Sequence, residues 1–163
     1  MNCQNCGAPL TPVTEKNYLY CRHCTTFYFP AGNRDQVEVL HQPAHLACPY
    51  CRTEMVTAVV DGLQVVHCNK CRGLLIQQST FSKLLRSLRA NLPGMTEPKK
   101  IEDRELNRKL DCPNCGKVMD THPYAGPGNI VIDLCLDCRF IWLDYGELYL
   151  TSTAPGRDRA WLF

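Results

Sequence analysis

The twelve cysteines of this chain form six pairs, each with two residues between the partners. The pairs are Cys3/Cys6, Cys21/Cys24, Cys48/Cys51, Cys68/Cys71, Cys112/Cys115 and Cys135/Cys138. A turn of this spacing directs two sulfur atoms at one ion about 2.3 Å away and supplies half of a tetrahedral site. The chemistry to expect is metal binding by thiolates, with two pairs for each ion.

The intervals between the pairs predict which of them share an ion. Within three presumed units the two pairs are 14, 16 and 19 residues apart, whereas 23 and 40 residues separate successive units. The two longer internal intervals lie within the usual spacing of four-cysteine zinc sites, and the first falls just short of it. We therefore expect three Zn²⁺ sites that use every cysteine.

Other uses of the cysteines are less consistent with the sequence. Cys48-Pro49-Tyr50-Cys51 is similar to a glutaredoxin active-site tetrapeptide, but Met55 to Val66 is typical of two short strands around Asp61-Gly62 and not of a helix. Iron is the closer alternative, because a rubredoxin-like site uses the same four thiolates. His23 and His67 lie in or beside cysteine pairs, and we expect them outside metal shells that already have four ligands.

The sequence also indicates the cellular compartment of the protein and its net charge with zinc bound. Met1 leads directly into the first cysteine pair, which leaves no room for a secretory signal, and no apolar run approaches the roughly 20 residues that span a bilayer. We therefore expect a cytoplasmic protein with reduced thiols and no membrane contact. The formal charge is +2, but zinc binds the thiolate form, so three occupied sites bring the net charge to about −4.

A repeat extends beyond the cysteines when the three units are aligned on their second pair. Trp142 then matches Leu75 and Tyr28, and Leu143 matches Ile76. Each copy is too small to fold on apolar burial alone, so bound zinc is expected to supply much of its stability.

The third unit resembles the bacterial zinc-ribbon family named after the ribbon of transcription factor TFIIB. The matching residues are Cys112-Pro113-Asn114-Cys115-Gly116, Cys135-Leu136-Asp137-Cys138, Trp142-Leu143-Asp144 and Gly146-Glu147-Leu148. The second unit is similar in part, through its cysteines, Pro49 and Gly73, and the first retains little beyond cysteines, Gly7 and aromatic residues. The resemblance implies a ribbon fold with bound zinc, and no particular activity.

We predict a small, metal-stabilised, mainly β fold of three tandem four-cysteine zinc ribbons joined by a helical spacer. The units are ribbon 1 (1–32), a linker (33–47), ribbon 2 (48–79), the spacer (80–111), ribbon 3 (112–152) and a C-terminal tail (153–163). Apolar residues at helical spacing predict one spacer helix at about 80–92, capped by Ser79 or Thr80, and a second at about 101–110.

Two shorter elements are expected outside the spacer. Asp144 followed by Glu147 is a capping-box pattern, so a short helix is expected to begin with Asp144 as its N-cap. Val37 and Val39 predict a brief strand within the linker.

Function is expected to lie in binding and not in catalysis. Four thiolates close each coordination shell, and neither a His-Glu-x-x-His nor a His-x-Glu motif is present, so we predict no enzyme activity. We predict instead a protein–protein interaction module, a scaffold or adaptor, that binds a protein partner or a second copy of itself. The apolar candidates for that contact are Phe81, Leu84, Leu85, Leu88, Trp161, Leu162 and Phe163.

Two alternatives to this use of the spacer helix remain. Its apolar face can pack against the chain's own ribbons, which is what amphipathic helices most often do. Its basic residues Lys83, Arg86 and Arg89 favour DNA or RNA binding in transcription or translation, although acidic residues intersperse the segment that follows.

Overall fold

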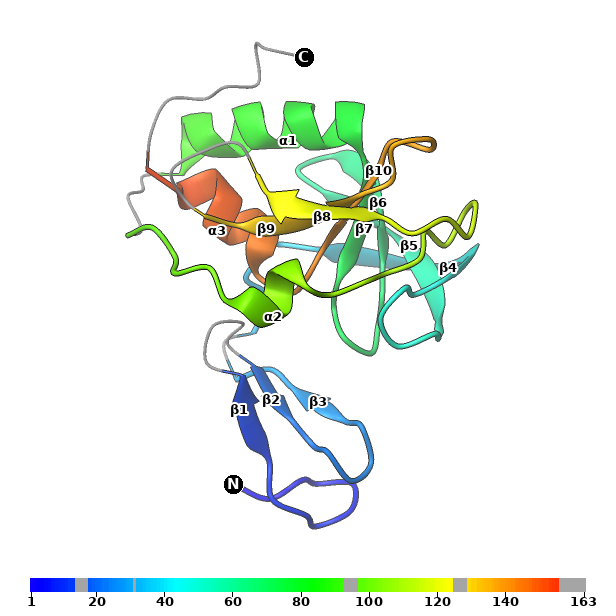
Figure 1. Cartoon of the computed structure of the whole chain (residues 1–163), viewed down its shortest axis with the longest axis vertical. Helices are drawn as coiled ribbons and strands as arrows, with labels where there is room; N and C mark the ends of the chain where they lie inside the picture. Colours follow the sequence, from blue (N-terminus) through cyan, green and yellow to red (C-terminus); the bar gives the residue numbers. More distant parts are fainter. Residues whose placement is uncertain (14–17, 31, 93–96, 125–128, 156–163) are drawn as a thin grey trace.

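The computed structural model in Figure 1 describes residues 1–13, 18–30, 32–92, 97–124 and 129–155. Its strands form two antiparallel sheets, one of three strands and one of seven. The small sheet has the order β1 (Thr11–Val13), β2 (Tyr18–Tyr20) and β3 (Phe27–Tyr28), all from ribbon 1. Mainly β structure with three four-cysteine clusters confirms the predicted fold class.

Ribbons 2 and 3 share the larger sheet, whose order is β4-β5-β6-β7-β10-β9-β8. The strands are β4 (Glu38–Ala47), β5 (Glu54–Val60), β6 (Leu63–His67), β7 (Leu74–Gln77), β8 (Asp120–Pro123), β9 (Val131–Leu134) and β10 (Phe140–Leu143). The predicted strands around Asp61-Gly62 are confirmed as the β5–β6 hairpin, in which both turn residues have positive φ, 47° and 74°. These two ribbons are halves of one body, and not separate small units.

The two halves meet at β7 and β10, which pair about a local two-fold axis. Trp142 lies opposite Leu75, while Ile141 faces Ile76 and Leu143 faces Leu74. Trp142 and Leu75 are also the positions that the sequence repeat equates. The two halves therefore pair through equivalent strands, with equivalent residues opposite each other, as in an isologous dimer interface.

Both faces of the shared sheet are buried at its centre, so β7 and β10 are apolar at every buried position. On one face Leu74, Ile76 and Leu143 belong to a core completed by the helices. On the opposite face Leu75 and Trp142 belong to a second core that contains cysteines of ribbons 2 and 3. The alternation follows from the two-residue period of a strand.

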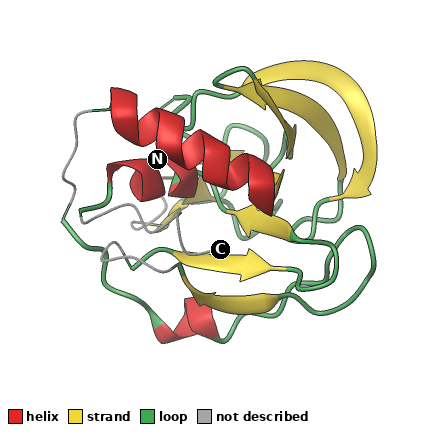
Figure 2. Ribbon diagram, turned by 90° about the horizontal axis from the view of Figure 1, so that it is seen from above, coloured by secondary structure: helices red, strands yellow, loops and turns green. Residues whose placement is uncertain are grey.

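Helix α1 (Gln78–Asn91) lies across one face of the larger sheet, as Figure 2 shows, and contacts β6, β7, β10 and helix α3 (Glu147–Thr153). It begins after Gln77, which makes no side-chain cap, so the predicted caps Ser79 and Thr80 are wrong. Its apolar residues lie in the core at 0 to 9% exposure: Phe81, Leu84, Leu85 and Leu88. The prediction that they bind a partner is corrected, because the sheet already covers this face.

The second predicted spacer helix, at about 101–110, forms only in part. Only one turn forms, α2 (Asp103–Leu106). Beyond it the chain is extended against ribbon 3, where the Met119 N–H donates to the Leu110 carbonyl at 2.8 Å and Asp111 bridges to Val118. These backbone contacts replace the helical ones.

The segment predicted as a linker with a brief strand contains the ten-residue edge strand β4. Its pairing with β5 shifts register twice, and His41 and His45 have positive φ, 59° and 56°. Such bulges hinder an edge strand from pairing with another chain.

Asp35, in the same segment, caps helix α3 of ribbon 3. Its carboxylate accepts hydrogen bonds from the Gly146 N–H at 2.6 Å and the Tyr149 N–H at 2.9 Å. Burial raises the pKa of Asp35 to about 6. The predicted capping box forms only in part: the Asp144 N–H donates to Glu147 at 2.7 Å, but Gly146, and not Asp144, is the N-cap.

Candidate metal centres and the adjoining cleft

The six cysteine pairs lie in turns of one geometry. In each turn the residue after the second cysteine donates its N–H to the carbonyl of the first cysteine at 2.8 to 2.9 Å. That residue has positive φ in every case: Gly7, Thr25, Arg52, Arg72, Gly116 and Arg139. Only two of the six are glycine, so four turns hold a side chain in a conformation that costs about 1–2 kcal/mol. The turn is therefore set by the cysteines and their metal more than by glycine.

The turns bring the twelve cysteines together in the three predicted groups of four. Within each group all sulfur atoms lie within 4.8 Å of one another. The Cys51–Cys68 and Cys48–Cys71 sulfur pairs, for example, are 3.3 and 3.7 Å apart. A tetrahedral zinc with Zn–S bonds of about 2.3 Å places its sulfur atoms about 3.8 Å apart, so the donor sets fit zinc. No histidine belongs to these groups in the part of the chain that the structure describes.

Polar side chains beside each site can stabilise its thiolates. The Thr26 hydroxyl lies 3.1 Å from the sulfur of Cys24 and, as the main cause, lowers the pKa of that thiol to about 5. Thr53 lies 3.2 Å from the Cys51 sulfur, and Asn114 donates to Cys138 at 3.1 Å. Hydrogen bonds of this kind orient metal ligands and support the ionised form.

The sites differ in burial. Cys48 and Cys68 of ribbon 2 are fully buried and Cys71 is nearly so, beside Trp142 in the second core. In ribbons 1 and 3 one cysteine is exposed, Cys6 and Cys115 respectively. The ribbon 2 site is therefore the most buried of the three, whereas each of the other two has one exposed ligand.

Comparison with protein families gives one match. Residues 47–87 match the zinc-ribbon TFIIB family, described as a transcription factor zinc-finger. The match covers ribbon 2 and most of α1, while ribbon 3, predicted to resemble the family more fully, has no match of its own. Comparisons with curated proteins and with solved structures give no significant match. Together with the geometry of the clusters, the zinc-ribbon match identifies three Zn²⁺ sites.

Arg108 links the spacer to ribbon 3. Its guanidinium donates to Asp133 and, at 2.6 Å, to Asp144, which also accepts the Trp142 indole N–H at 3.2 Å. Burial by itself would lower the pKa of Arg108, but the two carboxylates outweigh it and raise that pKa above its usual value. Two residues of the ribbon 3 signature, Trp142 and Asp144, thus help to hold the spacer in place.

The remaining predicted site residues do not form one surface. Lys83 and Arg86 are exposed on α1, but Arg89 is half-buried and donates to the Thr151 carbonyl at 3.1 Å. Trp161, Leu162 and Phe163 lie outside the described residues. Among the helices described, none has the length and apolar character needed to cross a membrane.

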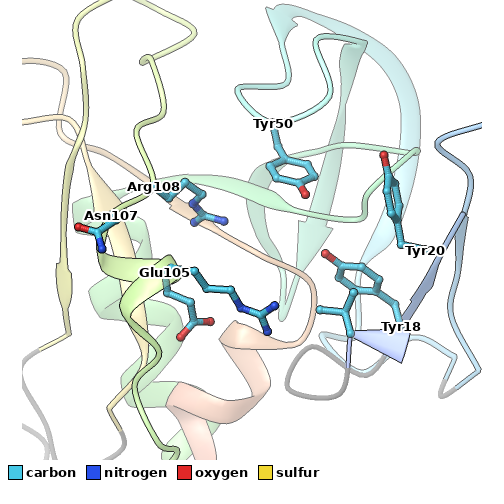
Figure 3. Close-up of a pocket in the computed structure, with 8 residues that line it drawn as sticks. Tyr18, Tyr20, Tyr50, Glu105, Asn107 and Arg108 are labelled. Atoms are coloured by element: carbon cyan, nitrogen blue, oxygen red, sulfur yellow. The ribbon is translucent and has the colours of Figure 1, made fainter. Parts of the chain in front are cut away.

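A cleft of about 520 Å³ lies where ribbon 1 meets ribbon 2 and the spacer (Figure 3). The residues that line it are Val13, Tyr18, Tyr20, Tyr50, Arg104, Glu105, Asn107 and Arg108. They come from three segments far apart in the sequence, which is why sequence reasoning missed the cleft. The available signal was the Tyr18-Leu19-Tyr20 alternation, which places two phenol rings on one side of a strand.

An aromatic cluster backs the cleft. The ring of Phe27 lies 5.3 Å from Tyr18, 4.9 Å from Tyr20 and 6.2 Å from Tyr50, measured between centroids. Aromatic pairs at these distances stabilise one another beyond simple burial. Tyr50 is nevertheless 44% exposed, so the cluster offers ring surface to a ligand.

Further contacts between ribbon 1 and the larger body hold ribbon 1 in place. Phe29 lies 4.5 Å from Tyr145, and Arg72 covers Phe29 at 4.3 Å and donates to the Gly32 carbonyl at 3.0 Å. The walls of the cleft are therefore fixed relative to each other by packing and hydrogen bonds.

Proposed function

We propose that this chain is a zinc-dependent protein-interaction module, a scaffold or adaptor, whose partner binds at the tyrosine-lined cleft. The observation that carries the proposal is the gathering of Tyr18, Tyr20 and Tyr50 opposite arginine side chains in one preformed hollow. Tyrosine and arginine are enriched in the parts of protein interfaces that contribute most to affinity.

The zinc ions have a structural role in this proposal. Four thiolates fill the coordination shell of each ion, whereas catalytic zinc keeps one position open for water or substrate. The two walls of the cleft belong to ribbon 1 and to the body formed by ribbons 2 and 3. Zinc therefore supports binding by folding both walls, and we propose no enzymatic activity. A cytoplasmic location is part of the proposal, since reducing conditions keep thiols available for metal.

Nucleic-acid binding is the second candidate, favoured by the exposed Lys83 and Arg86 within the residues that match a transcription factor zinc-finger family. Two observations weigh against it. Arg89 is engaged with α3, and the zinc-loaded chain has a net charge of about −4. Phosphate contacts give most of the affinity of non-specific nucleic-acid binders, so few available cations and a negative net charge disfavour that role.

Affinity capture tests the proposed function. The full-length, zinc-loaded chain is used as bait in reducing buffer, with and without nuclease, and the zinc, protein and nucleic acid in the eluate are measured. We expect a stoichiometric protein partner that survives nuclease and is lost when zinc is chelated. A nuclease-sensitive eluate, weakened by Lys83→Glu with Arg86→Glu, would support the second candidate instead. Recovery of the bait alone would contradict the scaffold role.

A further inference from the structure

We infer that the tyrosine-lined cleft binds a cationic side chain, an arginine or a lysine, presented by a basic peptide segment of the partner. The inference rests on the proposed function and adds the chemistry that the partner must bring. Three features of the cleft support it: the arrangement of its aromatic rings, the balance of charge around it, and its size.

The rings can receive a cation on their faces. Tyr18 and Tyr20 are two residues apart on β2 and so point to the same side, and Tyr50 approaches from a zinc-binding turn of ribbon 2 (Figure 3). The face of a phenol ring is electronegative and attracts ammonium and guanidinium groups within about 6 Å of its centre. A hollow bounded by several such rings favours a cation over a neutral or anionic group.

The charges around the cleft also favour a cation. Arg108 lines it, but this one guanidinium faces two carboxylates, those of Asp133 and Asp144. Nearby, Lys99 contacts Glu105 at 2.6 Å, and Arg104 contacts Glu102. These ion pairs set four carboxylates against three cations, so the charge of the two arginines that line the cleft is offset, and they oppose a cationic ligand less than free guanidinium groups would.

The pKa of Tyr18 also reflects the charges around the cleft. Its pKa is raised chiefly by burial and then by the negative charge of Asp144. Burial by itself disfavours a charge of either sign, so only the contribution of Asp144, partly offset by Arg108, favours a cation beside this hydroxyl.

The size of the cleft suits a side chain together with its flanking backbone. About 520 Å³ lies within the range of roughly 300–1,000 Å³ that small-molecule sites occupy. The hollow is much larger than an inorganic cation requires. An extended peptide that inserts one long basic side chain fits both this volume and the aromatic wall.

Peptide binding to the full-length, zinc-loaded chain tests the inference. The probe is a fluorescein-labelled nonapeptide of alternating glycine and arginine, compared with the same peptide carrying lysine or glutamate, and binding is followed by fluorescence anisotropy. We expect binding of the two basic peptides and none of the acidic one. Tyr50→Ala should weaken binding about tenfold, because a cation–π contact is lost, while Tyr50→Phe should stay within about twofold of the native chain.

Tyr28→Ala is the matched control. Tyr28 lies in the same small sheet but is paired with Leu19, on the face opposite to Tyr20 and Phe27. Its removal should leave peptide affinity unchanged. An equal loss in Tyr28→Ala and Tyr50→Ala, or tyrosine-dependent binding of single-stranded oligothymidine in place of the basic peptides, would overturn the inference. Three zinc ions per chain in every variant would show that each one is folded.

The same variants separate this inference from the proposed function. If the captured partner binds Tyr50→Ala as well as the native chain, the cleft assignment is wrong while the scaffold role stands. If no partner is captured but the basic peptides bind in a Tyr50-dependent way, the cleft site stands and the scaffold role falls.

Discussion

Ribbon 1 and the paired ribbons 2 and 3 use the same cysteine turns but build different kinds of structure. Ribbon 1 keeps a three-stranded sheet of its own, in which β3 has only two residues. Ribbons 2 and 3 pair through four-residue strands β7 and β10 and share a sheet and two cores. Metal coordination therefore sets the turns and hairpins of each ribbon, whereas strand length and the apolar residues on both strand faces decide whether ribbons merge.

The largest difference between the two regions is expected from two separate variants, each of which removes one zinc ligand from one region. Structural zinc contributes about 10–16 kcal/mol of apparent binding energy, comparable to the whole stability of a domain. Cys68→Ser acts in the buried ribbon 2 site and should unfold the shared sheet, reducing bound zinc from three ions to one. Cys6→Ser should release only the ribbon 1 ion and leave amide protection in the larger sheet intact.

Native mass spectrometry and hydrogen exchange measure these outcomes. A Cys68→Ser chain that keeps the ribbon 3 ion, with β8 to β10 still protected, would show that ribbons 2 and 3 fold independently. Loss of all zinc from Cys6→Ser would show that ribbon 1 supports the rest of the molecule.

A second prediction concerns the buried charges that belong only to the paired region. Arg108→Met leaves Asp133 and Asp144 without their cation, and breaking a buried pair in this way costs about 3–5 kcal/mol. Urea unfolding should show this loss. Arg104→Met, which removes an exposed partner of Glu102, should change stability by less than about 1 kcal/mol and is the matched control. Equal effects from the two variants would contradict the importance of the buried network.

The third prediction acts on the contact between ribbons 2 and 3. A Cβ atom at Gly73 would lie 2.2 Å from the buried ring of Trp142. Gly73→Ala should therefore destabilise the shared body by about 1–3 kcal/mol, as overpacking typically does. Adding Trp142→Leu, the residue type at the equivalent position 75, should recover part of the loss if this clash is the cause. Strictly additive losses in the double variant would count against it.

The smallest loss of stability is expected at Asp35, which lies in the segment that connects ribbon 1 to ribbon 2 and caps α3. Asp35→Ala removes the acceptor of two N–H groups at the start of α3 and should cost about 1–2 kcal/mol in thermal unfolding. Asp35→Asn keeps one acceptor and removes the buried charge, so its loss should be smaller. Zinc content should stay at three ions in both variants. A larger loss for Asn than for Ala would contradict the capping role.

Local features of this chain could be predicted because they depend on residues close in the sequence. The six turns follow from cysteines three positions apart, and the β5–β6 hairpin follows from Asp61-Gly62 between two apolar runs. Helix α1 was predicted from its apolar spacing, but the same spacing does not say what covers that face. The structure resolves this in favour of the sheet.

Features that depend on distant residues could not be predicted in the same way. Arg108 bonds Asp144 across 36 positions, and Asp35 caps α3 from 114 positions before Tyr149. The predicted second spacer helix is shorter than expected for this reason: its sequence favours helix locally, while the extended pairing beside ribbon 3 gives the backbone beyond α2 other partners. The cleft combines three separate segments and leaves no single motif.

The number of zinc sites, their ligands and the kind of fold follow from the sequence, because thiolate coordination is strong and its geometry is satisfied within each unit. The pairing of two ribbons in one sheet about a local two-fold axis, and the position of the first ribbon as one wall of a cleft, do not follow from it. These outcomes depend on packing and hydrogen bonds between segments far apart in the chain. Individually such contacts are weak, and several arrangements are compatible with the same cysteine spacing.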